Sequence, residues 1–538
     1  MNDANDRDGK IDPPALKLEA LTAKAGQRVL IEDLDLTFPA GKVSVIVGPS
    51  GAGKSVLLRS MAGLVEADEG IKIDGQVTLV DKQGDRGVSA GDVGVVFQQF
   101  ALFDEYSPTG NVSFALRNRK NQQADPESIE NSTEASDPAE WLNELSIPLN
   151  TPTSRLSGGQ KQRLAIARTL ASGVSIMLYD EPTSGLDHAT GTKVCSLIRE
   201  THERHRRTSI IVTHDYETVL AIADHVFLFS PTDRRLEEVS IDESELASRL
   251  RDEVDRTLSN AAPTVGHSPL QLSDILVRRL GSIALESLAL PYRLRPPKKI
   301  SARWIAGSVK HYLRLVAGPG GWVYLVLAGL IAGWTTTYFT LAYLPYRLYT
   351  QPLLLDELIA SIGFALYRIL VPVLATLLIA ARCGAAIASD CGMKRYSGVI
   401  DAYRTLATDG RSMLFWPAAV AMMIATPLLT GVAYIASRLM AAVVFASMYP
   451  DMEPVFLRSN FDRQLGGWTD PATIWLLGKT VACGLATATI AYEIGKSNKQ
   501  STRDVSLGIT STVLWATLAV LAIHALAAMQ EFPRAAAG

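Results

Sequence analysis

Val43-Ser-Val-Ile-Val47 leads directly into Gly48-Pro-Ser-Gly-Ala-Gly-Lys-Ser55, and this run decides the fold of the first half of the chain. The β-branched residues are typical of a buried parallel strand, and Ser55 to Gly63 is typical of a helix whose N-terminus faces the loop. In such a loop the glycines let backbone N–H groups close around phosphates, Lys54 reaches the β and γ oxygens, and Ser55 holds Mg²⁺. The predicted phosphate-binding residues are Gly48, Pro49, Ser50, Gly51, Ala52, Gly53, Lys54 and Ser55.

A glycine-rich turn without a ligand is the alternative for this loop alone, and the downstream motifs argue against it. Leu156-Ser-Gly-Gly-Gln160, Asp180-Glu181 and His214 follow in the order and spacing of ATP-binding cassette (ABC) ATPases, which the chain resembles from about residue 15 to 240. Ser175-Ile-Met-Leu-Tyr-Asp180 is a hydrophobic strand that ends in an acid, so we expect Asp180 to bind Mg²⁺ and Glu181 to polarise the attacking water. The resemblance implies a RecA-like α/β domain with ATP and Mg²⁺ as cofactors.

The same resemblance implies roles for three further polar residues. Gln98 in Val-Val-Phe-Gln-Gln is the expected sensor of the γ-phosphate and a further Mg²⁺ ligand, with Gln99 as the alternative. His214 is the expected switch that contacts the γ-phosphate, although a histidine after an apolar strand is more often a packed core residue. Asp187, in the loop Ser184-Gly-Leu-Asp, is expected to reach the partner subunit. The expected catalytic set is thus Glu181, His214 and Gln98, and the expected metal set is Ser55, Gln98 and Asp180.

The signature motif predicts the stoichiometry. In this family it opens a helix, here through Arg168, whose positive N-terminus caps the γ-phosphate bound to the loop of another subunit. One chain carries one phosphate loop and one signature, so two bound ATP molecules require two such domains head to tail, and we expect a homodimer. One family element is missing, because Leu21 to Leu30 contains no aromatic residue to stack on adenine, and base selectivity stays open. The signature residues are Ser157, Gly158, Gly159 and Gln160.

Charge divides the chain of 538 residues into unlike halves. Residues 1–266 carry 28 basic and 41 acidic side chains, whereas residues 267–538 carry 24 and 14, and these differences nearly cancel in the net charge of -3. The acidic first half is typical of a soluble domain and gives no indication of nucleic-acid binding, which needs a basic face. The four cysteines have no metal-ligand spacing and are expected to be small buried side chains. From the polar N-terminus we expect no cleavable signal peptide.

Long uncharged runs in the second half predict about five membrane spans, each near the ~20 residues needed to cross the hydrocarbon core. Basic residues gather before the first span, between the second and third, and between the fourth and fifth, which predicts that these sides are cytoplasmic and that the C-terminus lies outside. External segments at 345–367 and 440–472 are expected to be short loops. Gln271 to Leu290 and Ala302 to Val316 are expected to be amphipathic helices on the inner membrane surface, with a connector packed on the ATPase as the alternative. The spans are Gly321 to Leu344, Ile369 to Ser389, Met413 to Ser437, Ile474 to Tyr492 and Val505 to Met529.

The second half also resembles a family. Leu366 to Ala386, Ser397 to Leu406, Ile474 to Val481 and Ser501 to Ser506 are similar, in order and spacing, to the MlaE-type permease of the Mla/Mce lipid transporters. The resemblance implies a permease fused to its ATPase, lipid as substrate and an extracytoplasmic Mce-domain lipid carrier as partner. The chain departs from this family where Ile369 follows Arg368 in place of a glutamate, and a second family glutamate near Gly398 is also replaced.

The sequence predicts different surroundings for the charged residues near or within the spans. Residues 393–409 are predicted to be a coupling helix, with an apolar stripe that includes Tyr403 and with polar side chains that face the ATPase near Gln98. Arg382 is expected to face the bundle interior, a water-filled cavity or headgroups, with pairing to Asp390 as the structural alternative. Lys479 is expected to snorkel to the outer surface.

The sequence thus predicts an ABC ATPase domain followed by an all-α polytopic membrane domain. The expected function is ATP-driven transport of lipid, with phospholipid as the expected class, in the inner (cytoplasmic) membrane, with the ATPase in the cytoplasm. A mechanical signalling complex that regulates an external enzyme and a small-solute importer are the alternatives. The expected parts are a disordered N-terminus 1–14, the ATPase 15–245, a linker with interfacial helices 246–318, the permease 319–530 and a tail 531–538.

Overall fold

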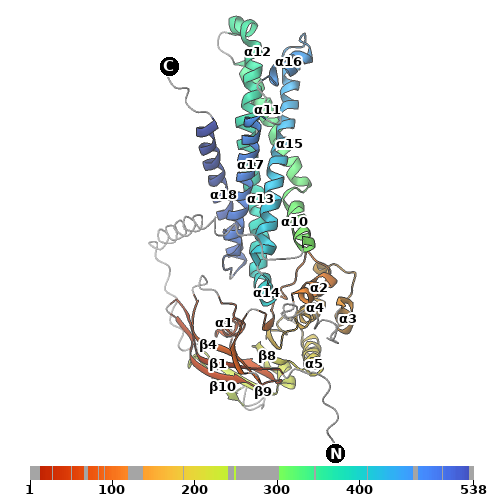
Figure 1. The fold of residues 1–538 in the computed structure, drawn as a ribbon, viewed down its shortest axis with the longest axis vertical. Helices are drawn as coiled ribbons and strands as arrows, with labels where there is room; N and C mark the ends of the chain where they lie inside the picture. The colour runs from red at the N-terminus through yellow and green to blue at the C-terminus, as the bar shows by residue number, and fades with distance from the viewer. Residues whose placement is uncertain are drawn as a thin grey trace, which may run out of the picture. The chain divides into compact units, whose positions relative to one another are not determined.

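The computed structural model describes most of the chain and divides it into two compact units (Figure 1). One unit consists of Met1–Pro296 together with Ser397–Asp409, and the other of Pro297–Tyr396 together with Gly410–Gly538. Ser50, the expected interfacial helix at 271–290, most of the expected N-terminal and linker segments, and the tail after Glu531 lie outside the described residues. The described residues are 13–26, 28–49, 51–65, 71–82, 84–89, 91–118, 137–185, 187–239, 248–249, 302–343, 347–408, 410–463, 470–499 and 501–531.

The first unit is built on two sheets. A six-stranded sheet has the order β10-β9-β3-β8-β7-β6 and is parallel except for β10, and a four-stranded antiparallel sheet has the order β2-β1-β4-β5. The strands β3, β6, β7 and β8 are buried almost throughout because helices cover both faces of such a sheet. The strands are β1 (Ala15–Ala25), β2 (Arg28–Phe38), β3 (Val43–Val47), β4 (Ile71–Asp81), β5 (Gly84–Gly87), β6 (Val93–Val96), β7 (Ile176–Asp180), β8 (Thr208–Thr213), β9 (His225–Ser230) and β10 (Arg235–Val239).

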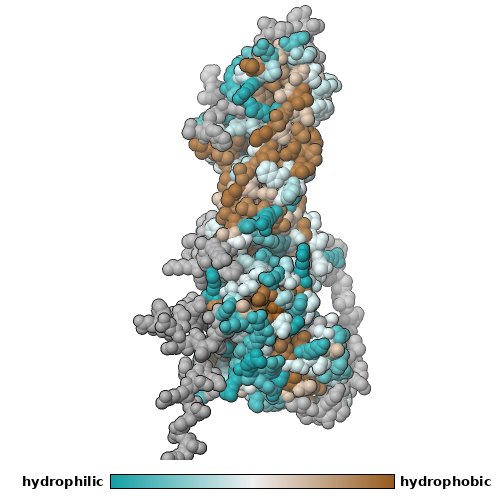
Figure 2. All heavy atoms as spheres, turned by 90° about the vertical axis from the view of Figure 1, so that its right-hand side faces the viewer, coloured by the Kyte–Doolittle hydropathy of each residue, from teal (hydrophilic) through white to brown (hydrophobic). Residues whose placement is uncertain are grey.

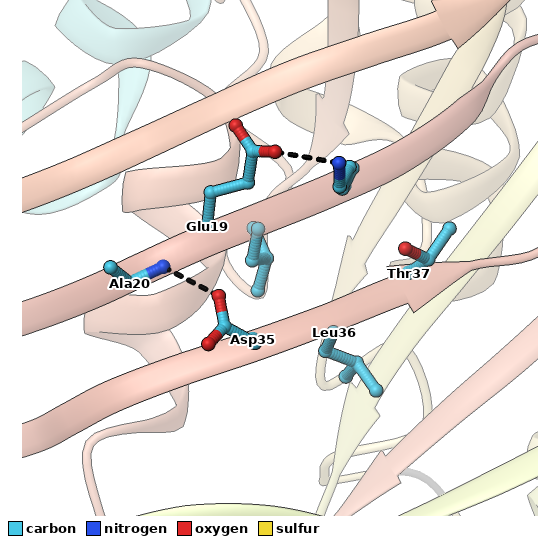
Figure 3. A pocket seen from close by; sticks show the side chains of 7 residues that line it. Glu19, Ala20, Asp35, Leu36 and Thr37 are labelled. Atoms are coloured by element: carbon cyan, nitrogen blue, oxygen red, sulfur yellow. Dashed lines mark hydrogen bonds and ion pairs between the residues drawn. The ribbon is translucent and has the colours of Figure 1, made fainter.

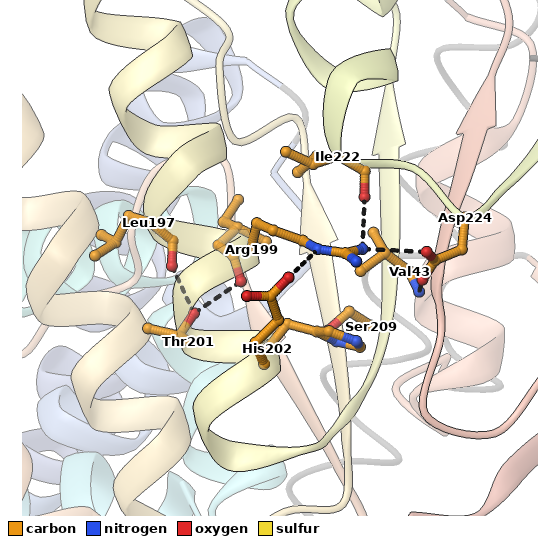
Figure 4. Close-up of polar contacts among 10 residues, drawn as sticks. Val43, Leu197, Arg199, Thr201, His202, Ser209, Ile222 and Asp224 are labelled. Atoms are coloured by element: carbon orange, nitrogen blue, oxygen red, sulfur yellow. Dashed lines mark hydrogen bonds and ion pairs between the residues drawn. The ribbon is translucent and has the colours of Figure 1, made fainter.

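Helices connect these strands, and polar contacts hold α5 (His188–His205) in place. Arg199 on α5 donates to Glu203, to the carbonyl of Ile222 and to Asp224, and Asp224 accepts in turn from the backbone N–H of Val43 (Figure 4). This network ties α5 to the start of β3. The helices are α1 (Lys54–Met61), α2 (Pro108–Arg117), α3 (Pro138–Glu144), η4 (Thr153–Arg155), α4 (Gly158–Ala171), α5 (His188–His205), α6 (Tyr216–Val219), η5 (Leu220–Ile222) and α14 (Val399–Thr405).

The second unit is a bundle of helices in which α13 packs against α15, α17 and α18. Five helical segments of the described chain are long and apolar enough to cross a membrane: Pro319–Ala342, Leu354–Tyr396, Arg411–Met448, Pro471–Lys496 and Thr502–Glu531. The expectation of an α/β P-loop domain followed by about five spans is therefore confirmed. The helices are α10 (Ala302–Val316), α11 (Pro319–Ala342), α12 (Arg347–Ala365), the π-helical turn η6 (Leu366–Leu370), α13 (Val371–Tyr396), the π-helical turn η7 (Arg411–Phe415), α15 (Trp416–Met448), α16 (Pro454–Phe461), α17 (Pro471–Lys496) and α18 (Thr502–Glu531).

The segments expected to be short external loops differ most from the sequence prediction. Residues 345–367 contain α12, which continues through η6 into α13, and residues 440–472 contain the end of α15 and all of α16. The apolar side chains of Leu355, Ile359 and Ile362 recur at helical spacing and are buried. This periodicity was obscured in the sequence by Asp356 and Glu357, which interrupt the apolar run.

The outer surface of the bundle is apolar. Figure 2 shows hydrophobic side chains gathered over its long helices, whereas hydrophilic side chains predominate over the sheet-containing unit. Leu327 and Ile331 on α11, Leu439 on α15 and Leu526 on α18 are all more than half exposed. A surface of this kind is typical of helices that face lipid.

Small residues bring α11 and α15 into close contact. A Cβ atom on Gly329 would lie 2.2 Å from the carbonyl oxygen of Ala433, and one on Gly333 would lie 2.1 Å from that of Ser437. These two glycines are four residues apart and therefore lie on one face of α11, the arrangement that lets membrane helices approach backbone to backbone.

We expect Gly333→Leu to destabilise the bundle by about 1–3 kcal/mol or more, because α11 must move away from α15 to admit the side chain. The measurement is the thermal unfolding midpoint of the purified protein in detergent. Gly431→Ala on α15 is the matched control, since a Cβ at Gly431 meets nothing within 4 Å. Equal midpoints for the two variants would contradict the close packing of α11 on α15.

Candidate active site

Four adjacent strands end at the same edge of the parallel sheet and deliver the expected site residues there. The loop that begins at Gly48 follows β3, Glu181 follows β7 and His214 follows β8, while Gln98 lies two residues beyond β6. Because β6, β7, β8 and β3 are neighbours, residues up to 166 positions apart in the chain meet at one edge. This edge is where ligands bind in open α/β sheets.

The glycine-rich loop holds Lys54 at the start of α1. Lys54 Nζ donates to the carbonyl oxygens of Gly48 and Pro49, both at 2.8 Å, and its side chain is buried. Burial lowers the pKa of Lys54, and the neighbouring carboxylates Glu181 and Asp180 act in the opposite direction. Gly53 has a φ of 110°, which favours glycine, and the N-terminus of α1 that follows it presents free backbone N–H groups.

Asp180 lies at the end of β7 with one carboxylate oxygen, Oδ1, buried and without a hydrogen-bond partner in the described residues. Burial raises the pKa of this carboxyl group to about 6, with a further upward effect from Glu181 and opposing effects from Lys54 and a hydrogen bond to Ser55. A buried oxygen that lacks a partner, beside a hydroxyl group, fits the ligand preference of Mg²⁺. The described residues contain no cluster of three or more His, Cys, Asp or Glu side chains arranged for a metal, and Mg²⁺ needs none when phosphates supply ligands.

Glu181 is the centre of a polar cluster. Gln98 Nε2 donates to Glu181 Oε2 at 3.1 Å and to Ser184 Oγ at 3.2 Å, and His214 Nδ1 lies 3.1 Å from Glu181 Oε1. Glu181 has a φ of 46°, a left-handed conformation that costs a non-glycine residue of the order of 1–3 kcal/mol. The structure thus brings together Gln98, Glu181 and His214 as expected from the sequence, and adds Ser184.

The signature residues lie at the start of α4, away from this cluster. Ser157 and Gln160 form reciprocal side-chain to backbone bonds at the helix N-terminus, where Ser157 and Gly158 are exposed. No hydrogen bond or ion pair joins Ser157 or Gln160 to the Gln98–Glu181–His214 cluster within the described part of the chain. Asp187 caps α5 by accepting from the backbone N–H of Thr190. Both motifs are therefore available to a ligand or a partner from outside this site.

The expected coupling segment belongs to the first unit and is shorter than expected. The helix α13 continues to Tyr396, and after Gly398 a separate short helix, α14, begins at Val399. Gly398 has a φ of 77°, and a Cβ atom at this position would lie 3.2 Å from the ring of Phe97, which is next to Gln98 in the chain. On α14, Asp401 forms an ion pair with Arg59 of α1 at 3.3 Å, and Tyr403 is fully buried.

Three charged groups lie inside the second unit. Lys479 Nζ donates to Glu531 Oε2 at 2.9 Å and to the carbonyl oxygen of Arg368 at 3.0 Å, so the expectation that Lys479 snorkels outward is wrong. The side chains of Lys479 and Glu531 are only 6% and 5% exposed, because α17 and α18 pack together at this point. Arg382 donates to the carbonyl oxygen of Val316 at the end of α10.

The sequence left open whether Asp390 pairs with Arg382. In the structure the partners of Asp390 are other residues. The carboxylate of Asp390 accepts from the hydroxyl of Tyr312 at 3.0 Å and from Lys394 at 3.0 Å, and His311 Nε2 lies 3.6 Å away. These contacts tie α10 to α13.

The antiparallel sheet has a shallow pocket between β1 and β2 that contains none of the expected site residues. Its walls include the ion-paired side chains of Lys17 and Glu19, and the backbone N–H of Ala20 donates to Asp35 at 2.8 Å (Figure 3). The strand β2 also borders the phosphate loop, because Leu30 lies 3.6 Å from the position of a Cβ on Gly53. No aromatic ring is present at 21–26 or 28–30, as the sequence indicated.

Comparisons with known proteins agree with the division of the chain into two units. Residues 31–184 match the family described as ABC transporter, and residues 316–530 match the family described as Permease MlaE. The sulfate/thiosulfate import ATP-binding protein CysA of Synechocystis sp. is 37% identical over 38% of this chain and 55% of its own length. The protein of the same name from Nocardia farcinica is 33% identical over 48% of this chain and 75% of its own length.

Among solved structures, the dimeric structure of MJ0796, a bacterial ABC transporter cassette, is 26% identical with a TM-score of 0.34 and covers 42% of this chain and 99% of that one. The chain spans about half the length of the Synechocystis relative, and the matched parts of the two relatives cover 38% and 48% of this chain.

Proposed function

Because the chain belongs to the ABC transporter family and joins an ATP-hydrolysing ABC domain to an MlaE permease domain in one multi-pass membrane polypeptide, we propose that it uses ATP to move lipid, specifically phospholipid, through its membrane domain. The observation that carries the proposal is the presence of both domains in one chain, with α14 from within the permease sequence packed on the ATPase unit. The MlaE family implies lipid as the substrate.

The proposed roles of the site residues follow from their positions. Backbone N–H groups of the loop from Gly48 to Ser55 and the Lys54 ammonium hold the phosphates, with ATP replacing the carbonyl contacts of Lys54. Ser55, Asp180 and Gln98 would hold Mg²⁺, which would supply positive charge against the phosphates.

The carboxylate of Glu181 accepts a proton from the attacking water and orients it for in-line attack on the γ-phosphate. Gln98 and His214, each within hydrogen-bond distance of Glu181, fix the position of that carboxylate and contact the γ-phosphate.

The functional unit is proposed to be a homodimer. The exposed N-terminus of α4, with Ser157, Gly158, Gly159 and Gln160, completes the γ-phosphate site of the second copy, and Asp187 lies at the same junction. Two copies placed head to tail close two such sites by symmetry. The cytoplasmic placement of the ATPase and the outside placement of the C-terminus follow from the distribution of basic residues.

Small-solute import is the rival function, since the curated relatives are named for sulfate/thiosulfate import. These alignments span only 207 and 262 residues, and the separate match of residues 316–530 is to the MlaE permease. The transported molecule contacts the membrane domain, so the permease match weighs more than the ATPase match. Lipid is therefore preferred, and an extracytoplasmic Mce-domain lipid carrier is the proposed acceptor or donor.

The test is reconstitution of the purified full chain in liposomes that contain a fluorescent phospholipid, with a purified Mce-domain protein outside. We expect ATP to drive transfer of the lipid between liposome and carrier, and ATP turnover to rise when phospholipid replaces detergent. The Glu181→Gln variant in the same liposomes is the control for ATP dependence. Normal ATP turnover without lipid transfer, and with stimulation by sulfate instead, would overturn the proposal.

A further inference from the structure

A group of polar side chains lies at the end of the bundle where α12 and α16 meet (Figure 1). Arg438 on α15 forms an ion pair with Asp462, which follows α16 directly. Tyr434 lies one helical turn before Arg438 and therefore on the same face of α15. The ring of Tyr434 meets the ring of Tyr367 in η6 edge-on, with centres 5.1 Å apart and planes at 63°. The hydroxyl of Tyr367 shares a hydrogen bond of 3.2 Å with Thr473 at the start of α17.

Two oxygen atoms of this group are buried and have no hydrogen-bond partner among the residues that the structure describes. They are the hydroxyl oxygen of Tyr434 and Oδ1 of Asp462. The other carboxylate oxygen of Asp462 contacts Arg438, so the carboxylate is only half satisfied. A buried polar atom without a partner is costly, and in native proteins it marks the place of a water molecule, an ion or a ligand. A group that donates hydrogen bonds fits here, because a carboxylate oxygen can only accept them.

The ion pair is open to the surroundings of the bundle, and negative charge predominates around it. The side chains of Arg438 and Asp462 are 41% and 33% exposed. Next to Asp462 in the chain, Arg463 is paired with both Asp356 and Glu357 of α12. These two neighbouring groups together hold two arginines and three carboxylates. The excess of negative charge attracts a cation and opposes an anion.

The depth of this group along α15 is that of a lipid headgroup. Arg438 lies 22 residues after Trp416, where α15 begins, and about 20 residues carry a helix across the hydrocarbon core. Tyrosine is enriched at this level because its ring is apolar and its hydroxyl is polar. Ile435 and Leu439, which follow Tyr434 and Arg438 in the chain, are more than half exposed. A charged pair thus lies beside an apolar surface that can take acyl chains.

From these observations we propose that the group binds the headgroup of a phospholipid that carries a primary ammonium, of which phosphatidylethanolamine is the simplest example. The ammonium donates to Oδ1 of Asp462 and to the hydroxyl oxygen of Tyr434, and it lies against the tyrosine rings, which attract cations. The phosphate accepts from the guanidinium of Arg438. Because the headgroup carries one charge of each sign, it meets both members of the ion pair and leaves neither charge without a partner.

The same geometry discriminates against other headgroups. A choline headgroup has the charge of an ammonium but no N–H, so it leaves the two buried oxygen atoms without a donor. A glycerol headgroup leaves the phosphate as a net negative charge near three carboxylates. The expected order of affinity is therefore ethanolamine above choline, and choline above glycerol. The inference rests on the proposed function, since it names the class of phospholipid that the membrane domain selects.

The experiment measures binding to the full chain in detergent. The rise of the thermal unfolding midpoint is followed as short-chain phosphatidylethanolamine, phosphatidylcholine or phosphatidylglycerol is added. In the wild type we expect phosphatidylethanolamine to bind about tenfold more tightly than phosphatidylcholine, the effect of one hydrogen bond to a charged group. In Asp462→Asn we expect this ratio to fall to about threefold or less, because a neutral amide is a weaker partner for an ammonium than a carboxylate.

Two further variants sharpen the test. Tyr434→Phe leaves the ion pair intact and is expected to lower the ratio in part, so the test does not depend on the folding of Asp462→Asn. Asp451→Asn is the matched control, because Asp451 is exposed between α15 and α16 and lies outside the group. It makes the same change of charge and is expected to keep the wild-type ratio.

The ratio compares two lipids in one protein, so a variant that is only less stable keeps the wild-type ratio. Such a result in both Asp462→Asn and Tyr434→Phe would overturn the inference, and so would equal affinities of the wild type for the two lipids. Soluble phosphoethanolamine that binds as tightly as the lipid would also contradict it, because acyl chains would then contribute nothing. If ATP drives transfer of none of the three lipids from liposomes, the proposed function fails instead, and this failure is separate because binding is measured without ATP.

Discussion

A Glu181→Gln variant is expected to hydrolyse ATP about 10²–10⁴-fold more slowly than the wild type while it still binds ATP, because general-base catalysis contributes rate enhancements of that size. Glutamine has the shape of glutamate and can still contact Gln98 and His214, which lie 3.1 Å from the two carboxylate oxygens. It cannot accept the proton of the attacking water. The loss is therefore confined to the chemical step.

The measurement combines steady-state phosphate release with equilibrium binding of a fluorescent ATP analogue. We expect the variant to accumulate in an ATP-bound dimer, detectable as a doubling of mass in size-exclusion chromatography with light scattering. A turnover above half of the wild-type value would show that the base lies elsewhere, and a loss of ATP binding would show that Glu181 is structural.

Lys54→Ala tests the binding of ATP at the same site. Lys54 is buried against the carbonyl oxygens of the phosphate loop, so its removal takes away the ammonium group that meets the phosphates and leaves two carbonyls facing them. We expect both ATP binding and hydrolysis to be lost. Lys193→Ala is the matched control, since Lys193 is exposed on α5 and is expected to leave both unchanged.

The motifs of the family, rather than recognition of the strands, singled out Lys54, Gln98, Glu181 and His214 in the sequence. The structure places these residues at one edge because the carboxyl ends of parallel strands lie together in a sheet. What the sequence could not provide was the side-chain pairing within the cluster. The sequence indicated only that Ser184 lies in a loop, yet its hydroxyl oxygen accepts a hydrogen bond from Gln98. Its role depends on the turn after Glu181, whose positive φ carries no sequence signal in a non-glycine residue.

In the membrane half, the sequence predicted where the spans lie but not the connecting helix or the partner of a buried charge. Hydropathy located the five spans, because each long apolar run must cross a core of known thickness. It did not reveal α12 or the π-helical turns, since these depend on how neighbouring helices satisfy the backbone. It also misplaced Lys479, because a lysine near the end of an apolar run has the same pattern whether it reaches water or a partner. That partner, Glu531, lies 52 residues further along the chain.

The Lys479–Glu531 pair leads to the second large expected effect. Lys479→Met is expected to destabilise the protein by about 3–5 kcal/mol, because it leaves the Glu531 carboxylate buried without its main cation. Arg368 remains 4.0 Å from Glu531 Oε1 and offsets only part of that loss at such a distance. The double variant Lys479→Met/Glu531→Leu is expected to recover most of the stability, since two apolar side chains replace two charges in a site that excludes water.

The thermal unfolding midpoints of four proteins in nanodiscs are compared: the wild type, both single variants and the double variant. The departure of the double variant from the sum of the two single shifts shows whether the side chains interact. A charge that is buried away from water is costly unless it has a partner, so the single variants should be less stable than the double variant. If the losses of Lys479→Met and Glu531→Leu were instead additive, the two side chains would act independently. The link that they make between α17 and α18 would then contribute nothing to the stability of the bundle.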